Sequence, residues 1–522
     1  MEKSSNILAI DVGSTKVCAI IAEIKEVSGD VRIIGAGVEK SQGLKRGSIT
    51  NIDLASRSIK TAFEDAKRVA GTFETEAIVS ISGAYTKSID SSGIVNVPNG
   101  EINLTEIDRV MQTAKYNANI PSDYDVLHIL PYNFKVDEQD FVEDPLGMNA
   151  SRLEAYTHII VTPKSNFNNL KRAVELAGLK VKNIVLNSYA SSIATVNQDE
   201  KSLGVGVIDM GGNTSSFVIH AAGNAIRYNG FLGVGSNHIT NDLSMALHTP
   251  ITVAENVKIT YGNLNYYSDD LIELPVIGDE NSTHEVSLDI VGQVIQARAA
   301  ETLQLIAKQI DDSGLRRDIG AGFVLTGGLT KLDGIRELAM NILNSPVRLA
   351  KPKHLSGLFE SLRDPAFSTS IGLIMYSTGS HSLYEFDSNG KMRYNEEVVE
   401  QQQIPNSISL ENIAPINNNF GNSIGNQPPK STEYEDYNRG GNGGASQNIP
   451  LSQKNNSDYG NIPNINNITS QGSALNTKPQ PIEKELNGTN YYNQGGGNIT
   501  PQAGQNQSGS FTKMWQWITQ LF

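Results

Sequence analysis

The sequence predicts a mixed α/β protein built from two similar halves, followed by a long polar segment and a short apolar C-terminal segment. Three observations lead to this prediction. From residue 7 to about residue 380, β-rich apolar runs alternate with helical patterns, such as residues 77–81 and then 104–117. A turn near the N-terminus is repeated in the middle of the chain. After about residue 400, Asn, Gln, Gly, Ser and Pro dominate until apolar residues return at Phe511.

Composition excludes several classes of protein. The 522 residues suffice for two or more domains, and 39 % apolar residues can bury cores in most of the chain. The formal charge of −14 argues against non-specific nucleic-acid binding, because that binding favours a basic surface. We therefore expect no nucleic-acid partner. The single cysteine, Cys18, excludes an intrachain disulfide and a Cys-based zinc site, and we expect it to be a buried strand residue.

The N-terminal stretch carries no pattern of a secretory signal. Asp11 and Lys16 interrupt the apolar run, so no signal-peptide core can be drawn there. No unbroken apolar window of about eighteen residues occurs elsewhere, which is the length that a spanning helix needs. We therefore expect a protein that is made in the cytoplasm and does not span a membrane, although it could lie on one.

The repeated turn is the first element of a predicted ligand site. Its two copies are Ile10-Asp11-Val12-Gly13-Ser14-Thr15-Lys16-Val17 and Ile208-Asp209-Met210-Gly211-Gly212-Asn213-Thr214-Ser215. Apolar β-branched runs flank each copy, so each is predicted to be the turn of a β-hairpin. An Asp-x-Gly turn offers backbone N–H groups and hydroxyls to an anion, and its carboxylate can hold a cation through water. One such turn is equally explained by an ordinary glycine turn, whereas two on repeated hairpins favour a phosphate site.

Two further elements extend this site. The apolar strand 323–326 runs into Gly327-Gly328-Leu329, where glycines allow a backbone to approach a flat purine closely. A simple strand-to-helix turn remains the alternative. The last element is a helix over residues 239–247 followed by Ala254-Glu255-Asn256-Val257-Lys258. Glu255 and Lys258 are also explained by a solvated pair on a helix surface.

The order of these four elements resembles that of actin, sugar kinases and heat-shock ATPases. Within this superfamily, residues 7–380 resemble the FtsA family of bacterial cell division proteins. The segments that carry this narrower resemblance are Gly43-Leu44-Lys45-Arg46-Gly47, Val126-Leu127-His128-Ile129-Leu130-Pro131, Asp144-Pro145-Leu146-Gly147-Met148 and Phe367-Ser368-Thr369-Ser370-Ile371-Gly372. The resemblance implies an actin-like fold of two α/β lobes with ATP in the cleft between them and a small inserted subdomain.

The resemblance also implies a division of the chain into parts. The first lobe would comprise residues 1–82 and 164–202, with the inserted subdomain over 83–163. The second lobe would comprise 203–229 and 321–385, with its own subdomain over 230–320. A flexible linker over 386–509 and an amphipathic helix over 510–522 would follow. The polar part of this linker, about 110 residues, would have coil dimensions on the order of 55–60 Å.

By the same resemblance, the nucleotide site contains residues from both halves. The first phosphate loop would be Asp11, Gly13, Ser14, Thr15 and Lys16, the second Asp209, Gly211, Gly212, Asn213 and Thr214, and the surroundings of the adenosine Glu255, Lys258, Gly327, Gly328 and Leu329. Mg²⁺ would be held through water by Asp11 and Asp209. Asn213 and Ser216 depart from the commoner Asp-x-Gly-Gly-Gly-Thr-x-Asp pattern, and we expect binding to survive because Asn tolerates positive φ.

Hydrolysis needs a group that orients the attacking water. The corresponding segment, residues 186–192, contains no carboxylate and only Asn187 as an amide. We therefore expect the nucleotide to act mainly as a structural switch, with slow turnover or none.

The family resemblance implies several partners. The inserted subdomain would help molecules meet one another end to end in filaments, and the 230–320 subdomain would receive the C-terminal peptide of the tubulin-like FtsZ. Later division proteins would bind as well.

The last twelve residues form an amphipathic pattern. On a helix, Phe511, Met514, Trp515, Ile518, Leu521 and Phe522 fall within an arc of roughly 120°, which Trp517 flanks. Both tryptophans of the chain lie here, and Trp favours the headgroup boundary of a bilayer. The pattern predicts a helix on the cytoplasmic face of the cell membrane and matches the C-terminal helix of the FtsA family. A helix that docks back on the globular body is the alternative.

Two other functions keep the nucleotide motifs. A sugar or acid kinase of the same superfamily would need a catalytic Asp in the cleft, which the sequence does not supply. A pilus-assembly ATPase has a similar inserted subdomain. Both leave the linker and the terminal amphipathic segment unexplained.

Overall fold

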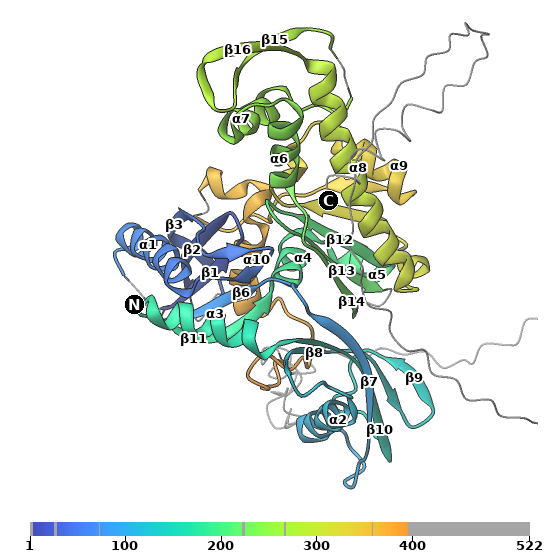
Figure 1. The fold of residues 1–522 in the computed structure, drawn as a ribbon. Helices are drawn as coiled ribbons and strands as arrows, with labels where there is room; N and C mark the ends of the chain where they lie inside the picture. Colours follow the sequence, from blue (N-terminus) through green and yellow to red (C-terminus); the bar gives the residue numbers. More distant parts are fainter. Residues whose placement is uncertain are drawn as a thin grey trace, which may run out of the picture. The chain divides into compact units, whose positions relative to one another are not determined.

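The protein is described from a computed structural model, and the described residues are 4–25, 29–72, 74–221, 225–265, 268–357 and 359–394 (Figure 1). Residues Met1–Ala414 form one compact unit. The second unit, Pro415–Phe522, lies outside the described residues. The predicted linker beyond residue 394 and the predicted membrane helix over 510–522 therefore also lie outside them.

The first lobe is built on a five-stranded sheet with the order β11-β6-β1-β2-β3. Strands β1, β2 and β3 form an antiparallel meander, and β6 and β11 add to β1 in parallel. The bounds are β1 (Ser4–Val12), β2 (Lys16–Lys25), β3 (Val31–Lys40), β6 (Glu76–Ile81) and β11 (Lys180–Leu186). Burial on both faces explains why β2 is apolar and buried without a break from Val17 to Ala22. Cys18 lies in this stretch, fully buried, as predicted.

The second lobe repeats this topology in a sheet with the order β14-β13-β12-β17-β18. Strands β12, β13 and β14 are again an antiparallel meander, and β17 and β18 again add in parallel. The bounds are β12 (Val205–Met210), β13 (Ser215–Ala221), β14 (Ala225–Leu232), β17 (Phe323–Thr326) and β18 (Val347–Leu349). The expected pair of similar halves is thus present, each opening with the predicted hairpin.

Helices cover and join the two sheets. Helix α1 packs on β2 and β3 and on α3, while α8 packs on β14 and α9. Helices α4 and α10 pack against each other and lie between the two sheets (Figure 1). The bounds are α1 (Ile52–Ala70), α3 (Lys164–Leu176), α4 (Asn187–Thr195), α5 (Gln198–Leu203), α8 (Leu288–Asp312), α9 (Ile335–Leu343) and α10 (Ser368–Ser377). Short elements complete the lobes: β4 (Leu44–Lys45), β5 (Ser48–Ile49), and the 3₁₀ turns η1 (Arg316–Asp318), η2 (Gly328–Lys331), η3 (Glu360–Arg363) and η4 (Pro365–Phe367).

An inserted subdomain lies in the chain between β6 and β11. It consists of a four-stranded antiparallel sheet, β7-β10-β8-β9, covered by one helix. The bounds are β7 (Lys87–Asn96), α2 (Leu104–Asn117), β8 (Tyr124–Val136), β9 (Gln139–Val142) and β10 (Arg152–Pro163). Asn103 caps α2 in a capping box with Glu106. The subdomain buries its own core, which includes Ile107, Met111 and Leu153.

This insert also contacts the second lobe directly. Asn229 on β14 accepts a hydrogen bond from Ser88 at 2.8 Å and donates one to Thr86 at 2.9 Å. The guanidinium of Arg227 lies 3.8 Å from the ring centroid of Tyr132. Asn229 is buried, so its side chain is held by these partners instead of by water. The insert therefore bridges the two lobes.

A second subdomain lies between β14 and β17. It contains α6 (Ser236–Ala246), α7 (Ile251–Tyr261), β15 (Leu271–Val276), β16 (Asp279–Ser287) and the first part of α8. Within it, Arg298 on α8 forms an ion pair with Asp242 on α6 at 2.6 Å and so joins these two helices. Figure 1 shows the β15–β16 hairpin at the end of this subdomain that is remote from the second sheet.

The folded body continues past the predicted linker boundary at residue 385. Phe386 is fully buried and pairs with Ile129 on β8 through both backbone hydrogen bonds. The Tyr384 hydroxyl donates to Asp144, and Asp387 accepts from Asn183. We call residues 381–394 the strap. Its apolar positions pack into the core of the insert, which is why the chain stays on the body where composition alone suggested a linker. Across the described residues, no helix is both long enough and apolar enough to cross a bilayer.

Candidate functional site

The two repeated turns have the same local geometry. In the first, the N–H of Gly13 donates to the carbonyl of Lys16 at 3.0 Å. In the second, the N–H of Gly211 donates to the carbonyl of Thr214 at 2.9 Å. Each turn closes a hairpin whose first strand has an Asp as its last residue but one, Asp11 on β1 and Asp209 on β12. The repeat in the sequence is thus a repeat in three dimensions.

The two turns meet across the lobes. The side-chain amide of Asn213 donates to the carbonyl of Ser14 at 3.2 Å. A Cβ on Gly212 would lie 2.1 Å from the methyl carbon of Thr15, so only glycine fits at this approach. Asn213, which replaces the third glycine of the commoner pattern, therefore links the lobes, and it is the one predicted residue that does not line the cleft described next.

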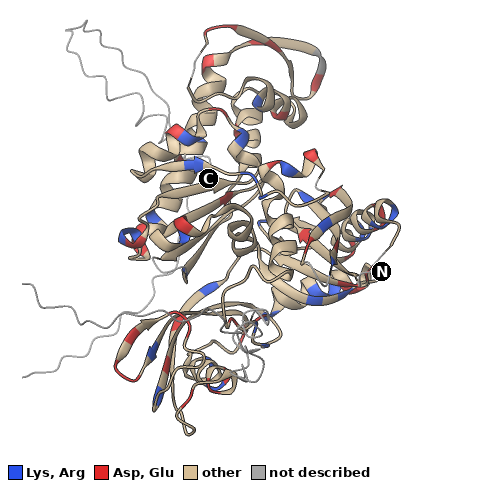
Figure 2. Ribbon diagram, turned by 180° about the vertical axis from the view of Figure 1, so that it is seen from behind, with Lys and Arg blue, Asp and Glu red and all other residues tan. Residues whose placement is uncertain are grey.

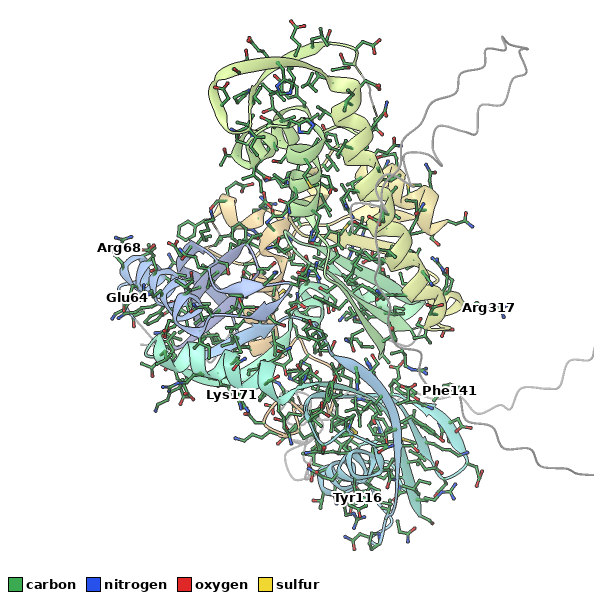
Figure 3. The ribbon with its side chains drawn as sticks, viewed as in Figure 1. Glu64, Arg68, Tyr116, Phe141, Lys171 and Arg317 are labelled. Atoms are coloured by element: carbon green, nitrogen blue, oxygen red, sulfur yellow. The ribbon has the colours of Figure 1, made fainter. Side chains whose placement is uncertain are left out.

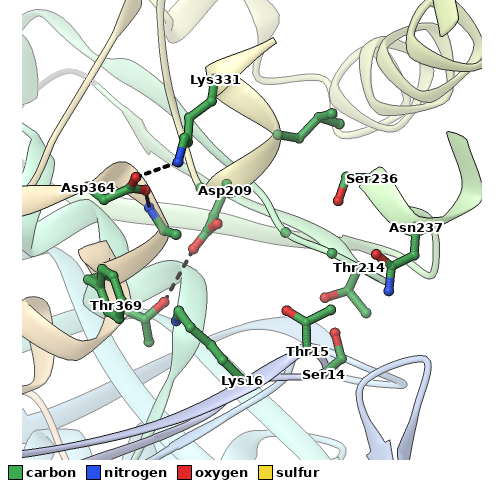
Figure 4. Close-up of a pocket in the computed structure, with 18 of the residues that line it drawn as sticks. Ser14, Thr15, Lys16, Asp209, Thr214, Ser236, Asn237, Lys331, Asp364 and Thr369 are labelled. Carbon is green, nitrogen blue, oxygen red and sulfur yellow. Dashed lines mark hydrogen bonds and ion pairs between the residues drawn. The ribbon is translucent and has the colours of Figure 1, made fainter. Parts of the chain in front are cut away.

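A cleft of about 600 Å³ opens between these turns. It is lined by Asp11, Gly13, Ser14, Thr15, Lys16, Asp209, Gly211, Gly212, Thr214, Glu255, Lys258, Gly327, Gly328 and Leu329 among the predicted residues. Ser14, Thr15, Thr214, Ser236 and Asn237 surround one side of it, and Lys16, Asp209 and Thr369 lie together on the other (Figure 4). Its size is typical of a site for a drug-sized or nucleotide-sized ligand.

The two aspartates are held by hydroxyl groups. Asp11 accepts from Ser80 at 2.8 Å and from Ser370 at 3.3 Å, and it pairs with Lys16 at 3.3 Å. Asp209 accepts from Ser191 at 2.6 Å and from Thr369 at 3.3 Å. Burial raises the pKa of Asp209, and the nearby Asp11 carboxylate adds to this effect, while the Ser191 bond opposes it.

Lys16 lies at the centre of this charged group. Its ammonium lies 4.7 Å from the ring centroid of Phe367. Burial by itself would lower the pKa of Lys16, but the Asp11 carboxylate, Cys18 and Asp209 together outweigh burial and the pKa is raised. The lysine is therefore held as a cation that faces the cleft.

Two helices of the second subdomain form the far wall. The Lys258 ammonium donates to Glu255 at 2.7 Å and to the Thr240 hydroxyl at 2.9 Å. Only 11 % of the Lys258 side chain is exposed, so Glu255 and Lys258 are part of the wall of the cleft and not a solvated pair. The first N–H groups of α6, those of Ser236 and Asn237, already donate to the carbonyls of Gly211 and Gly212. These hydrogen bonds hold the second turn in place. The two turns, and not the first N–H groups of α6, are therefore the groups that face a ligand.

The Gly327 turn closes the cleft. Gly327 has φ +91, and a Cβ there would lie 2.4 Å from an oxygen of Asp209. Thr326, at the end of β17, shares a hydrogen bond of 2.6 Å with Ser368 at the start of α10. Opposite this turn, Lys331 donates to Asp364 at 2.8 Å. Burial by itself would raise the pKa of Asp364, but the Lys331 bond, the Ala366 N–H and the charges of Lys331 and Lys16 together outweigh burial and the pKa is lowered.

Several residues that line the cleft were not predicted as site residues. They are Asn187, Ser216, Ser236, Asn237, Ile259, Gly262, Lys331, Leu332, Asp364, Ala366, Phe367 and Thr369. The run Ser368-Thr369-Ser370 was a usable signal, because hydroxyls at the start of α10 contact Thr326, Asp209 and Asp11. Nothing local in the sequence marks Lys331 or Asp364. Asn187, the only amide expected near the reacting phosphate, does line the cleft.

The cleft suits ATP better than it suits a directly bound Mg²⁺ ion. A polyphosphate attached to a flat base suits this lining. The chain comes close to its neighbours at Gly212 and Gly327, and hydroxyl groups and three lysines line the cleft. The carboxylates are less suited to direct metal binding, because Asp11 and Asp209 already accept from the groups named above. Among the described residues there is no group of three or more His, Cys, Asp and Glu side chains that could hold a metal ion.

Comparisons with known proteins identify relatives of this chain. A family model described as "Cell division protein FtsA" matches residues 206–372, and one described as "SHS2 domain inserted in FTSA" matches residues 83–161. The chain is 42 % identical over 429 residues to "Cell division protein FtsA" of Helicobacter pylori, covering 76 % of this chain and 86 % of the relative. It is 36 % identical over 385 residues to "Cell division protein FtsA" of Pseudomonas aeruginosa, covering 73 % of this chain and 91 % of the relative.

A solved structure shares the architecture. The "PilM-PilN type IV pilus biogenesis complex" matches with a TM-score of 0.51 and 15 % identity, covering 71 % of this chain and 98 % of the matched chain. At this identity the likeness concerns the fold alone. Together with the duplicated sheets, it confirms the predicted actin-like fold with an inserted subdomain.

Proposed function

Because the chain belongs to the FtsA family of cell division proteins, we propose that it binds ATP, joins the FtsZ ring and anchors that ring to the cytoplasmic membrane. The observation that carries this proposal is the convergence of both Asp-x-Gly turns, the α7 wall and the Gly327 turn on one cleft of about 600 Å³. An actin-like protein of this family would use the bound nucleotide to control self-association.

In the proposed complex each part of the cleft has a separate role. Backbone N–H groups and hydroxyls of the two turns hold the phosphates, as such turns do for anions. Glu255 and Lys258 bind the ribose, and the Gly327 turn with Leu329 packs on the base. Asp11 and Asp209 would hold Mg²⁺ through water, because those carboxylates already have protein partners, and the ion would supply positive charge to the phosphates.

Nucleotide turnover is proposed to be slow or absent. Asn187 is the residue of α4 that lines the cleft, and an amide cannot accept a proton from the attacking water as a carboxylate does. The described carboxylates of the cleft are engaged: Asp11 with Lys16, Asp209 with Ser191, Glu255 with Lys258, and Asp364 with Lys331. Rapid, steady phosphate release by the purified protein would refute this part of the proposal.

Self-association is proposed to use the inserted subdomain. Tyr116, near the end of α2, is 89 % exposed, and Phe141, on β9, is 86 % exposed. Both side chains point away from the insert into solvent (Figure 3). Both rings are therefore free to pack against a second copy of the chain in a filament.

The 230–320 subdomain is the proposed site for the FtsZ peptide. Met245, Ile251, Leu271 and Ile277 are each more than half exposed there. The β15–β16 hairpin carries acidic side chains (Figure 2). An apolar surface beside acidic groups suits a peptide with both apolar and basic residues. Later division proteins are proposed to bind other surfaces of the same assembly.

Membrane attachment is proposed for residues 511–522. Six apolar side chains at about 1.5–3 kcal/mol each are largely offset by ordering twelve residues at about 1–2 kcal/mol each. One helix would therefore bind only marginally, and a filament that carries many helices would bind through avidity. Self-association would then control how long the protein stays at the division site.

Sedimentation with liposomes in the presence of ATP tests this proposal. The full chain is compared with a chain truncated after Gly509 and with the double variant Trp515→Gln and Trp517→Gln. Only the full chain should co-sediment. If the truncated chain co-sediments equally well, the terminal segment is not the anchor. A variant that no longer self-associates should bind far more weakly, and equal binding by that variant would exclude the avidity argument.

A further inference from the structure

Helix α4 carries one group that contacts the cleft and another that contacts the strap. The hydroxyl of Ser191 donates to the cleft carboxylate of Asp209 at 2.6 Å. Two residues earlier, the hydroxyl of Tyr189 donates to Glu385 of the strap at 2.5 Å. Residues two apart in a helix point about 200° apart, so these two side chains leave nearly opposite faces of α4. A single helix therefore contacts both the cleft and the strap.

Helix α10 has the same two kinds of contact. Near its start, the hydroxyl of Thr369 donates to Asp209 at 3.3 Å. Near its end, the hydroxyl of Tyr376 donates to Glu385 at 2.5 Å. The guanidinium of Arg393, at the end of the strap, also donates to the backbone carbonyl of Tyr376 at 3.0 Å. The same two helices thus hold a carboxylate of the cleft and the carboxyl group of the strap.

The two helices are packed too closely to shift independently. A Cβ on Gly372 of α10 would overlap the carbonyl oxygen of Ala190 on α4. The hydroxyls of Ser191 and Thr369 also share a hydrogen bond of 2.8 Å between the helices. Closely packed elements transmit a displacement, because there is no free volume to absorb it. A change at the cleft end of this helix pair therefore reaches the end that contacts the strap.

The strap joins this helix pair to the inserted subdomain. Glu385 is fully buried between the helices, and on either side of it the strap contacts the insert. Phe386 pairs with Ile129 on β8 through both backbone hydrogen bonds, and the hydroxyl of Tyr384 donates to Asp144 at 2.7 Å. A buried carboxyl group that loses its partners costs free energy. The hold of α4 and α10 on Glu385 therefore affects how firmly the strap attaches the insert to the first lobe.

We propose that nucleotide binding in the cleft strengthens the attachment of the strap, through α4 and α10. A nucleotide shifts this equilibrium because it binds more tightly when the strap is attached, since only then do the helices hold Asp209 in a fixed position. By linkage, release of the strap weakens nucleotide binding by the same factor. This inference rests on the proposed nucleotide function and specifies how occupancy of that site is passed to the insert and to the chain that follows the strap.

Amide hydrogen exchange of residues 381–394 in the full chain measures this attachment. The N–H groups of Phe386 and Arg393 donate to the carbonyls of Ile129 and Glu385, so they exchange only when the strap opens. Saturating ATP with Mg²⁺ should slow their exchange at least about fivefold, the lower end of typical couplings between two sites. Unchanged exchange in the strap, while the cleft segments become protected, would overturn the proposal and leave the nucleotide site intact.

Two variants test the reciprocal effect on affinity. The double variant Tyr189→Phe and Tyr376→Phe removes both hydroxyls that hold Glu385, and neither tyrosine lines the cleft. Its dissociation constant for ATP, measured by titration calorimetry, should rise at least about fivefold. Asn183→Ala is the matched control, because Asn183 holds Asp387 of the strap at 3.0 Å from β11 and not from α4 or α10. It should speed exchange around residue 387 and keep the ATP affinity within about twofold of wild type.

The outcomes separate this inference from the proposed function. If the double variant does not fold, Tyr376→Phe alone takes its place, with an effect of the same sign. Equal ATP affinity of the tyrosine variant and wild type would overturn the proposal, and so would an equal loss of affinity in Asn183→Ala. No ATP binding by wild type would refute the proposed nucleotide site and, with it, this inference.

Discussion

Glu385 offers a sharp test of the contacts that join the strap, the insert and the first lobe. Its carboxylate is fully buried and accepts hydrogen bonds of 2.5 Å from the hydroxyls of Tyr189 on α4 and Tyr376 on α10. The Ser382 N–H donates to it as well, at 3.2 Å. His128 on β8 lies 3.9 Å away and accepts from the Leu186 N–H through its other ring nitrogen.

These surroundings favour the neutral acid. Burial raises the pKa of Glu385 from 4.5 to about 7, although the bonds from Tyr189 and Tyr376 oppose the rise. Burial also lowers the pKa of His128 to about 3, with Arg393 and His158 adding to the effect, so the histidine is neutral and does not stabilise a carboxylate.

The perturbation is Glu385→Gln, which keeps the shape and removes the proton equilibrium. In wild type, the stabilisation from neutral Glu385 is fully present below pH 4.5 and is lost as the pH rises through about 7. A pKa raised by this amount corresponds to about 3 kcal/mol of stability lost between the two limits. The glutamine cannot accept both tyrosine bonds, which costs about 1 kcal/mol at all pH values.

We therefore expect Glu385→Gln to match wild type in stability near pH 5 and to be more stable than wild type at pH 8. The assay is urea unfolding followed by far-UV circular dichroism at pH 5, 6, 7 and 8. Glu360→Gln, at a side chain that is 84 % exposed, is the matched control and should run parallel to wild type. Parallel pH profiles for wild type and Glu385→Gln would refute the reasoning.

Three further predictions concern close approaches and the bridge between insert and second lobe. Asn229→Ala leaves the hydroxyls of Thr86 and Ser88 without their partner, so it should lower the free energy of unfolding in urea by about 1–3 kcal/mol and speed proteolysis of the insert. An unchanged cleavage rate would contradict the bridge. Gly212→Ala puts a Cβ 2.1 Å from the methyl carbon of Thr15 and should weaken ATP binding to the folded protein by about tenfold or more, as measured by calorimetry. Unchanged affinity would show that the two turns need not touch. Gly372→Ala puts a Cβ 1.8 Å from the backbone oxygen of Ala190 on α4 and should cost about 1–3 kcal/mol in thermal unfolding; an unchanged melting temperature would exclude the tight crossing of α4 and α10.

The parts of the fold that the sequence predicted are those with a local signal. Each Asp-x-Gly turn is specified by the few residues around Asp11 or Asp209. The strands on either side of each turn pair with each other and so fix the register of both hairpins. The helix expected over 104–117 and the strand expected over 77–81 follow from apolar periodicity and are present as α2 and β6. In each case neighbouring residues carry the whole pattern.

The parts that the sequence did not predict depend on distant residues. Lys331 and Asp364 form a hydrogen bond although they come from segments with no shared motif. Asn229 contacts the insert more than a hundred residues away in the chain. Phe386 was assigned to the linker because the family resemblance was followed only to residue 385, yet its backbone pairs with Ile129. Tertiary contacts of this kind override local composition.

Amide hydrogen exchange of the full chain, measured with and without ATP, shows directly whether a nucleotide is held between the two lobes. ATP should slow amide hydrogen exchange in four segments together: 11–16, 209–214, 255–258 and 327–329. These segments come from both lobes and the second subdomain and share only the cleft. Protection of one lobe alone, or no protection in any of the four, would contradict a nucleotide held between the lobes.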